Sequence, residues 1–359
     1  MIKYLGSKRT LVHRIVEVAS CLPEVTTALD LFSGTARVGH ALKSAGFKVH
    51  SNDHNRYAYT LATCYVQCDL EDHMQDMIEL LEHLNHLEGK AGYITETFCE
   101  RSHFFKPKNG ARIDAIREEI EHLNLDEERK AIALVSLMEA ADRVDSTTGV
   151  QMAYLKSWAP RASNDLKLRM PNIVRQAVHG KGTASQLDAL DGARQLRADL
   201  AYLDPPYNQH KYLGNYHIWE SLVLWDKPEV YGVACKRIDC KERTSDFNSK
   251  RRAFQALENV IREIDAHHLI ISFSDEGFID RSEMEALLAS RGSVIVLEQD
   301  FKRYVGAQIG IYNPSGNRVG QVSHLRNTEY LYIVTPQPEI FEKNLERLHS
   351  HNKTSTKSA

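Results

Sequence analysis

The segment Asp204-Pro205-Pro206-Tyr207 follows the apolar-leaning run "RADLAY" and combines an acid, two prolines and an aromatic ring. The prolines fix the loop and withhold N–H donors, so the local backbone presents carbonyl oxygens. An exocyclic NH2 group of a nucleobase is a weak nucleophile because its lone pair is delocalised into the ring. The Asp204 carboxylate and the Pro205 carbonyl could accept its two hydrogens, and Tyr207 could stack on the base. A proline-rich strand exit is the plainer interpretation, but it leaves the acid and the ring unexplained.

A glycine turn in "LDLFSGTARVG" is a second candidate for ligand binding. It joins the short buried strand "TTALDLFSG" to a helix that Gly46 ends. Glycines let the backbone approach a ligand, and the N–H groups of the helix N-terminus can face a carboxylate or phosphate. The spacing Gly34-x4-Gly39 departs from the dinucleotide fingerprint, and the P-loop lysine is missing. Alone, the turn is equally compatible with a structural role.

Two aspartates near expected strand ends could hold parts of a nucleotide. Asp53 ends the strand "FKVHSND", where a carboxylate can accept both hydroxyls of a ribose. Its alternative role is a helix N-cap, but the nearby glycine turn favours the ribose. Asp188 in "SQLDAL" could accept a hydrogen bond from an adenine amino group, or it could cap the helix that follows.

Strand, glycine turn, helix and strand form a βαβ unit, which predicts a parallel sheet with ligands at the carboxyl ends of its strands. From residue 59 to 175 the pattern is helical, for example at Met74, Met77, Ile78, Leu81 and Leu84. We therefore expect a catalytic domain formed by 1–58 and 176–340, with the helical segment inserted as a possible target-recognition region. Strand signals resume at "GTASQLDAL", "ADLAYLDPP", "HHLIISFSD" and "GSVIVLEQDF".

Near the C-terminus, alternating residues around Asn313-Pro314-Ser315-Gly316 predict a hairpin, and "EYLYIVTP" predicts a final strand. Antiparallel strands there would cap the edge of the parallel sheet. Residues 345–359 are polar, and we expect a disordered tail.

Composition indicates a globular protein of 359 residues, with 42% hydrophobic and 26% charged residues. No apolar run approaches the roughly 18 residues that span a membrane, and the N-terminus lacks a secretory signal pattern. We expect a soluble, cytoplasmic protein. The six cysteines lack the C-x2-C repeat of a zinc site and the 17 histidines lack H-E-x-x-H, so we predict reduced thiols and no metal site.

The formal net charge of -3 conceals segments of opposite sign. Residues 68–90 carry seven acids against one lysine, whereas residues 154–175 carry five basic residues and one acid. Residues 233–254 carry seven basic residues and three acids. One face is therefore expected to meet phosphates and another only water.

Taken together, these motifs resemble the Dam-type, alpha-ordered group of adenine-N6 DNA methyltransferases, which use S-adenosylmethionine. The N-terminal motif K-Y-x-G-x-K matches Lys3-Tyr4-Leu5-Gly6-Ser7-Lys8. The cofactor motif F-x-G-x-G matches Phe32-Ser33-Gly34-Thr35-Ala36, with alanine at its last position, and Asp53 and Asp204 to Tyr207 complete the set in the family's order. The resemblance runs from residue 1 to about 335, although the insertion matches only in position.

The resemblance implies an α/β fold, with a Rossmann-like methyltransferase sheet that is mostly parallel, an antiparallel edge hairpin and a largely helical insertion. It implies that the cofactor is S-adenosylmethionine and that the flipped adenine is held by Asp204, Pro205, Pro206 and Tyr207, with N6 attacking the sulfonium methyl in line. The residues it implies around the cofactor are Tyr4, Lys8, Asp30, Phe32, Ser33, Gly34, Thr35, Asp53, Asp188 and Asp204.

Duplex DNA is the expected partner, and a cognate restriction endonuclease is a candidate functional partner. The segments "DSTTGVQMAYLKSWAPRA" and "CKRIDCKERTSDFNSKRR" and the hairpin around Asn313 are candidates for reading DNA. Their candidate contacts are Lys156, Arg161, Lys236, Arg237, Arg243, Lys250, Arg251 and Arg252, although a solvated surface role is the better interpretation for any single arginine.

Four alternatives remain beside this prediction. Cytosine-N4 methylation of DNA and adenine-N6 methylation of RNA need the same activation of an amino group. A nucleotide-binding oxidoreductase is disfavoured by the imperfect glycine fingerprint, and a non-catalytic DNA-binding protein is disfavoured by the intact DPPY segment.

Overall fold

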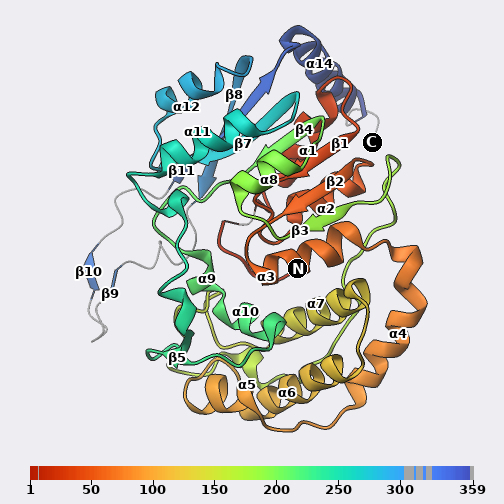
Figure 1. The fold of residues 1–359 in the computed structure, drawn as a ribbon, viewed down its shortest axis with the longest axis vertical. Coiled ribbons are helices and arrows are strands. Elements are labelled where there is room, and N and C mark those ends of the chain that lie inside the picture. The colour runs from red at the N-terminus through yellow and green to blue at the C-terminus, as the bar shows by residue number, and fades with distance from the viewer. Residues whose placement is uncertain (7, 303–310, 313–317, 321–325, 356–359) are drawn as a thin grey trace.

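A seven-stranded sheet forms the centre of the computed structural model, which describes residues 1–6, 8–302, 311–312, 318–320 and 326–355 (Figure 1). The strand order is β3-β2-β1-β4-β7-β11-β8. The strands are β1 Thr27–Asp30, β2 Lys48–Asn52, β3 Thr183–Ser185, β4 Leu200–Leu203, β7 His268–Ser274, β8 Ser293–Lys302 and β11 Arg326–Thr335.

The sheet is parallel except at β11, which runs antiparallel to both of its neighbours, β7 and β8. The predicted α/β fold class, a mostly parallel Rossmann-like sheet, is confirmed. The strand predicted at "EYLYIVTP" is the reversed one, and it lies between β7 and the edge strand β8 rather than at the edge itself. The strand order reverses between β1 and β4, and ligands of such sheets bind beside the carboxyl ends at this point.

Helices cover both faces of the sheet. Neighbouring residues of a strand point to opposite faces, and on each face they pack with helices into a separate core. In β1, Ala28 packs into one core and Leu29 into the other. All seven residues of β7 are buried, as expected for a strand covered on both sides. The first core is closed by α1 Val12–Cys21, α2 Arg37–Ser44 and α3 Arg56–Ala62, and the second by α8 Ala189–Gln195, α11 Ala253–Glu263 and α12 Arg281–Leu288.

A group of helices lies below the sheet in the view of Figure 1. Helix α3 continues into a π-helical turn, Thr63–Gln67, and a second such turn, Glu96–Glu100, follows α5 Tyr93–Thr95. The longer members are α4 Leu70–His86, α6 Pro107–His122 and α7 Glu127–Arg143, and they pack with α9 Tyr212–Asn215 and α10 His217–Leu224 from beyond the DPPY segment. Residues 144–182 contain only the short 3-10 helix Pro160–Ser163.

The apolar spacing in α4 predicts its buried face only in part. Met77, Leu81 and Leu84 are buried, whereas Met74 and Ile78 are exposed. The latter two therefore face solvent on the outer side of the helix.

Two small antiparallel sheets lie outside the main sheet. The antiparallel pair β9 Ile311–Tyr312 and β10 Arg318–Gly320 confirms the predicted hairpin, whose turn at 313–317 lies outside the described residues. Its predicted position at the edge of the main sheet is wrong, because the pair forms a separate two-stranded sheet and β8 is the edge strand. The pair β5 Val230–Tyr231 and β6 Lys236–Arg237 was not predicted.

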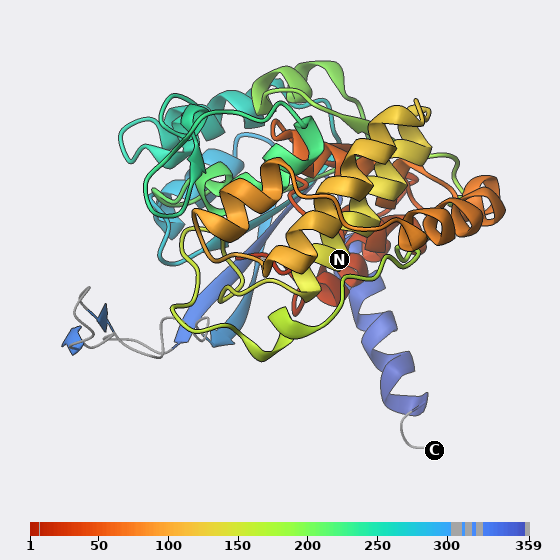
Figure 2. The same cartoon turned by 90° about the horizontal axis from the view of Figure 1, so that it is seen from below.

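The disordered tail expected from residue 345 is contradicted by the helix α14 Pro338–Ser355, while residues 356–359 lie outside the described residues. Figure 2 shows α14 running outward from the body of the protein. The polar composition concealed apolar positions at helical spacing, because Phe341 is buried and Leu345 and Leu348 pack against the same core as α1. Asn344 Nδ2 also donates to the Cys21 carbonyl at 3.0 Å.

All six cysteines are buried and unpaired, which agrees with the prediction of reduced thiols. Among the described residues, the structure contains no helix with the length and apolar character needed to cross a membrane.

Candidate active site

A single cavity lies beside the carboxyl ends of β1, β2 and β4, where the strand order reverses. Its walls include all ten residues predicted to surround the cofactor, together with Pro206. They come from sequence positions between 4 and 206, and the sheet topology brings them together. Pro205 and Tyr207 do not line this cavity, although they adjoin Pro206 in the chain.

The glycine turn between β1 and α2 has two residues in the left-handed region. Gly34 has a φ of 52°, and a Cβ there would lie 3.4 Å from the Tyr4 ring. Ala36 has a φ of 57° just before α2 begins. The residue that departs from the family motif therefore occupies a conformation in which glycine is preferred, and alanine there costs about 1 kcal/mol.

Asp53 is fixed by the backbone on both of its carboxylate oxygens. Gly34 N donates to Oδ2 at 3.0 Å and Asn55 N donates to Oδ1 at 2.9 Å. The structure assigns Asn55, not Asp53, to the N-cap of α3. A carboxylate held in this way keeps free lone pairs for hydroxyl donors in the cavity.

Asp188 fulfils the capping role and also lines the cavity. Its Oδ1 accepts a hydrogen bond from Leu190 N at 3.0 Å, as the N-cap of α8. The other oxygen is available to a ligand donor, so the two interpretations of this residue are compatible.

Asp30 is buried at the end of β1 and accepts a hydrogen bond from Gly39 N at 3.0 Å. Burial raises the pKa of Asp30 to about 7, against the stabilising hydrogen bond from Gly39. A Cβ on Gly39 would come within 2.6 Å of Ser51 Oγ, so only glycine allows the helix to approach the strands this closely. The cavity therefore contains a carboxyl group that titrates near neutral pH.

Beside the glycine turn, two polar groups of the cavity wall lack hydrogen-bond partners among the described residues. They are Arg37 Nε, at the start of α2, and the buried Ser33 Oγ. Buried donors without partners are costly, so these atoms suit a ligand that brings acceptors, such as a carboxylate. Sequence reasoning missed Arg37; its position directly after the cofactor motif and before a helix is the signal that could have found it.

The polar groups that line the cavity fit S-adenosylmethionine. Three carboxylates, Asp30, Asp53 and Asp188, suit the hydroxyls, amines and positive charges of that molecule. Arg37 and Ser33 suit its carboxylate. The aromatic side chain of Phe32, held edge-on by Phe247 with 5.1 Å between ring centroids, adds an apolar wall.

Asp204 is joined to a buried ion pair at the same cavity. Lys8 Nζ lies 3.1 Å from Asp204 Oδ1 and 2.5 Å from Glu329 Oε1. Desolvation raises the pKa of Asp204 to about 6, and the Lys8 ammonium limits the rise. Burial opposes the charge of Lys8, but the two carboxylates together raise the pKa of Lys8 well above its ordinary value.

Aromatic rings surround the DPPY segment. Tyr207 packs edge-on against Phe273, with centroids 5.9 Å apart, and its carbonyl accepts a hydrogen bond from Phe278 N at 3.0 Å. Tyr212, eight residues beyond Asp204, lines the cavity and stacks on Tyr4 at 5.3 Å with the rings only 6° from parallel. Sequence reasoning left the role of "NQHKY" open; its tyrosine forms part of the cavity wall.

A family model for D12 class N6 adenine-specific DNA methyltransferases matches residues 4–286. This chain belongs to that family. The match covers the N-terminal motif from Tyr4, the glycine turn, the helical segment and the DPPY segment, so it includes most of the residues that line the cavity.

Curated relatives of this D12 family chain are type II methyltransferases. M.FokI from Planomicrobium okeanokoites is 31% identical over 309 residues, covering 81% of this chain and 47% of that protein. M.NlaIII from Neisseria lactamica is 28% identical, covering 90% of this chain and 98% of that protein. M.CviAII from Paramecium bursaria Chlorella virus 1 is 29% identical, covering 93% and 98%. This chain thus spans about half the length of M.FokI and nearly all of the other two.

The predicted DNA contacts of this D12 chain divide into paired and exposed groups. Arg237 is buried, and both of its Nη atoms donate to Asp226 at 2.8 and 2.7 Å, so the expectation of a DNA contact is wrong for this residue. Arg161 is held by Asp145 and Arg243 by Glu220. Lys156, Lys250 and Arg251 are exposed, Arg252 is exposed beside Asp246, and Lys236 is half-buried. The exposed group remains a set of candidates.

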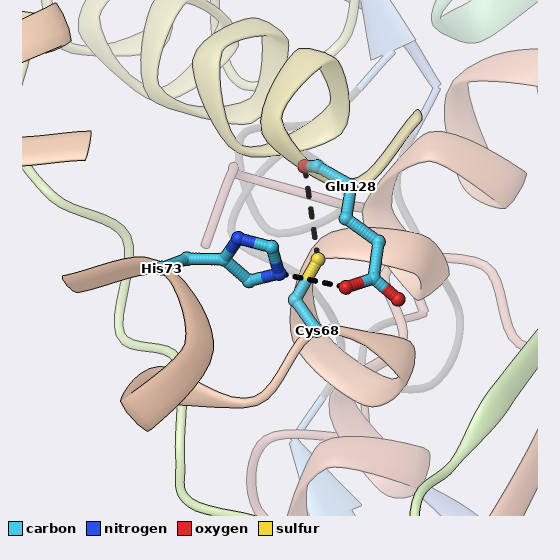
Figure 3. A group of neighbouring side chains, drawn as sticks. All are labelled: Cys68, His73 and Glu128. Carbon is cyan, nitrogen blue, oxygen red and sulfur yellow. Dashed lines mark hydrogen bonds and ion pairs between the residues drawn. The ribbon is translucent and has the colours of Figure 1, made fainter. Parts of the chain in front are cut away.

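Cys68, His73 and Glu128 place a thiol, an imidazole and a carboxylate within 4.8 Å of one another (Figure 3). Both oxygens of Glu128 already have partners, because Lys181 Nζ lies 3.0 Å from Oε1 and His73 Nε2 lies 2.6 Å from Oε2. Burial raises the pKa of the Cys68 thiol, which opposes the thiolate form that metals bind. We therefore assign this cluster a structural role in joining α4 to α7.

Proposed function

We propose that this chain transfers the methyl group of S-adenosylmethionine to the N6 amino group of an adenine in a specific sequence of duplex DNA. One observation carries the proposal: Asp204 of the DPPY segment opens into the same cavity as the cofactor motif and Asp53. A group activated by Asp204 and a ligand held by Asp53 would therefore meet. Membership of the D12 family and the type II methyltransferase relatives support the choice of adenine and DNA.

The chain would hold the cofactor through its carboxylates and its unpaired donors. Asp53 would accept the ribose hydroxyls, Asp188 the adenine amino group, and Arg37 would bind the carboxylate end. When bound, S-adenosylmethionine supplies a methyl group that is already activated by a sulfonium. The protein therefore has to provide proximity, orientation and hydrogen-bond acceptors rather than a covalent intermediate.

Asp204 and the Pro205 carbonyl would accept the two N6 hydrogens of an adenine that has left the helix. Removing the base from the stack costs a few kcal/mol, which contacts to the flipped base must offset. Tyr207 would offer the stacking surface. As the new N–C bond forms, the methyl–sulfur bond of the donor would break and leave a neutral thioether. N6 would then carry a positive charge and release one proton, which the Asp204 carboxylate would accept.

A cognate restriction endonuclease is the functional partner that we propose, because several relatives are named as type II methyltransferases. Such a partner would cleave the same sequence when it is unmethylated. Co-expression tests this: a chromosome methylated by this chain should resist the partner enzyme.

Transfer of a radiolabelled methyl group to duplex DNA tests the proposed activity. The wild type should label long DNA of mixed sequence, and Asp204→Ala should lose at least a thousandfold in rate while still binding the cofactor. Asp72→Ala serves as the control, because it removes an exposed carboxylate that does not line the cavity. Absence of label from DNA with the wild type would overturn the proposal, and label in RNA alone would redirect it to RNA.

A further inference from the structure

Glu329 lies on β11, the reversed strand, and its carboxylate is buried against the active-site lysine. Its Oε1 accepts hydrogen bonds from Lys8 Nζ at 2.5 Å and from Ser272 Oγ on β7 at 2.8 Å. Only 8% of the residue is exposed. No motif singled out this position, because it lies more than a hundred residues beyond the DPPY segment and outside the family match at 4–286.

A buried carboxylate is costly unless it is paired and hydrogen bonded. Here one ammonium group, Lys8, serves two carboxylates, Glu329 at 2.5 Å and Asp204 at 3.1 Å. The three groups together carry a formal charge of -1. A pair of Lys8 and Asp204 alone would be neutral, so Glu329 sets the charge that faces the cavity.

We propose that Glu329 is a positioning residue that anchors Lys8 beside Asp204 and shares its charge, so that Asp204 stays basic enough to accept an N6 hydrogen. This inference rests on the proposed function. Lys8 fixes one oxygen of Asp204. Because Glu329 shares the Lys8 ammonium, Lys8 neutralises Asp204 only in part, and Asp204 remains a strong hydrogen-bond acceptor. The excess negative charge also favours a cationic methyl donor in the adjoining cavity.

The pH dependence of activity follows from this arrangement. Asp204 must be ionised to accept the N6 hydrogen, and its pKa of about 6 is raised by desolvation and by Glu329 and lowered by Lys8. Removing the charge of Glu329 leaves Lys8 to act on Asp204 alone, so the pKa of Asp204 falls. The other titratable groups that face this cluster are Tyr202, Tyr207, Tyr212 and Asp30, and they stay unchanged in the variants below.

Glu329→Gln tests the proposal because it keeps the shape and an acceptor oxygen but removes the charge. We expect kcat to fall about 10-fold to 100-fold, with the KM for the cofactor changed less. In the plot of kcat against pH, the midpoint of the acidic limb should move down by about one pH unit. Glu329→Asp keeps the charge one methylene farther from Lys8, so the limb should move the same way by less. A purely structural role would lower activity without moving the limb.

Glu298→Gln is the matched control. It makes the same substitution on the neighbouring strand β8, in an exposed ion pair with Arg281, and should leave the limb where the wild type has it. If Glu329→Gln fails to fold, Glu329→Asp decides. A limb identical to that of the wild type in the folded variant overturns the proposal.

Titration of the Asp204 carboxyl carbon by NMR provides a readout that does not depend on methyl transfer. Its midpoint should lie near 6 in the wild type and lower in Glu329→Gln. An unchanged midpoint overturns the role of Glu329. If the wild type methylates no DNA, the proposed function fails, whereas the shift of this midpoint still decides whether Glu329 sets the basicity of Asp204.

Discussion

Gly34 N donates a hydrogen bond to Asp53 Oδ2 at 3.0 Å, which ties the glycine turn after β1 to the carboxylate at the end of β2. The turn and the acid, 19 residues apart, therefore form one rigid unit in the cavity wall. This contact links the glycine motif and the aspartate motif in space.

The first prediction concerns the charge of Asp53. Asp53→Asn keeps the size of the side chain but weakens the acceptor for ribose hydroxyls. Since hydrogen bonds to charged groups contribute about 1.5 to 3 kcal/mol, we expect the Kd for S-adenosylmethionine to rise about 10-fold to 100-fold. Calorimetric titration measures this, with Asp72→Asn as the surface control. Unchanged affinity in the Asp53 variant would exclude the ribose role.

A second prediction concerns Arg37, whose Nε has no partner among the described residues. Arg37→Gln should weaken binding of S-adenosylmethionine about tenfold or more, because a charge-assisted contact to its carboxylate is lost. The same variant should bind decarboxylated S-adenosylmethionine as well as the wild type does. Arg262→Gln, an exposed change on α11, is the control. Equal losses for both ligands would contradict the assignment of Arg37 to the carboxylate.

The third prediction uses the left-handed backbone at Ala36. Glycine adopts this φ without steric cost, which favours Ala36→Gly by about 1 kcal/mol, but the change also removes a buried methyl group that contributes about 0.8 kcal/mol. These two effects nearly cancel, so thermal unfolding of Ala36→Gly should occur within about 1 °C of the wild type. Ala45→Gly provides the contrast, since Ala45 has a φ of -80° at the end of α2 and glycine there should lower the unfolding temperature. A fall in unfolding temperature for Ala36→Gly as large as that for Ala45→Gly would contradict this prediction.

A fourth prediction links cofactor binding to pH through Asp30. Its folded pKa of about 7 lies above the ordinary value, so Asp30 destabilises the ligand-free fold as pH rises through 7. A cation in the cavity favours the ionised form, and binding of S-adenosylmethionine should therefore release protons near pH 7. Titration in two buffers of different ionisation enthalpy measures the proton count. Proton uptake would have the wrong sign, and Asp30→Asn should abolish the release.

Site residues that directly follow a strand could be predicted from the sequence. Asp204 could be placed because it directly follows β4, a short apolar run, and Asp53 because it ends the βαβ unit that the glycine turn predicts. The ends of β2 and β4 meet at one edge of the sheet. The reversed strand was also predicted, at "EYLYIVTP", but its place between β7 and β8 depends on pairing that no local pattern specifies.

Other features depend on tertiary contacts and were missed. Glu329 reaches Lys8 because β11 pairs with β7. Arg237 can be buried because Asp226 and Asp239 neutralise its charge. The polar C-terminal segment forms α14 because α1 offers an apolar surface for Phe341 and its neighbours. Composition alone could not distinguish that helix from a disordered tail.

The most direct test is to identify the nucleoside that receives the methyl group. Duplex DNA incubated with the wild type and deuterium-labelled S-adenosylmethionine can be digested to nucleosides and measured by mass spectrometry. We predict labelled N6-methyldeoxyadenosine as the methylated product, absent when Asp204→Ala replaces the wild type. Label in N4-methyldeoxycytidine, or none in any nucleoside, would contradict the account.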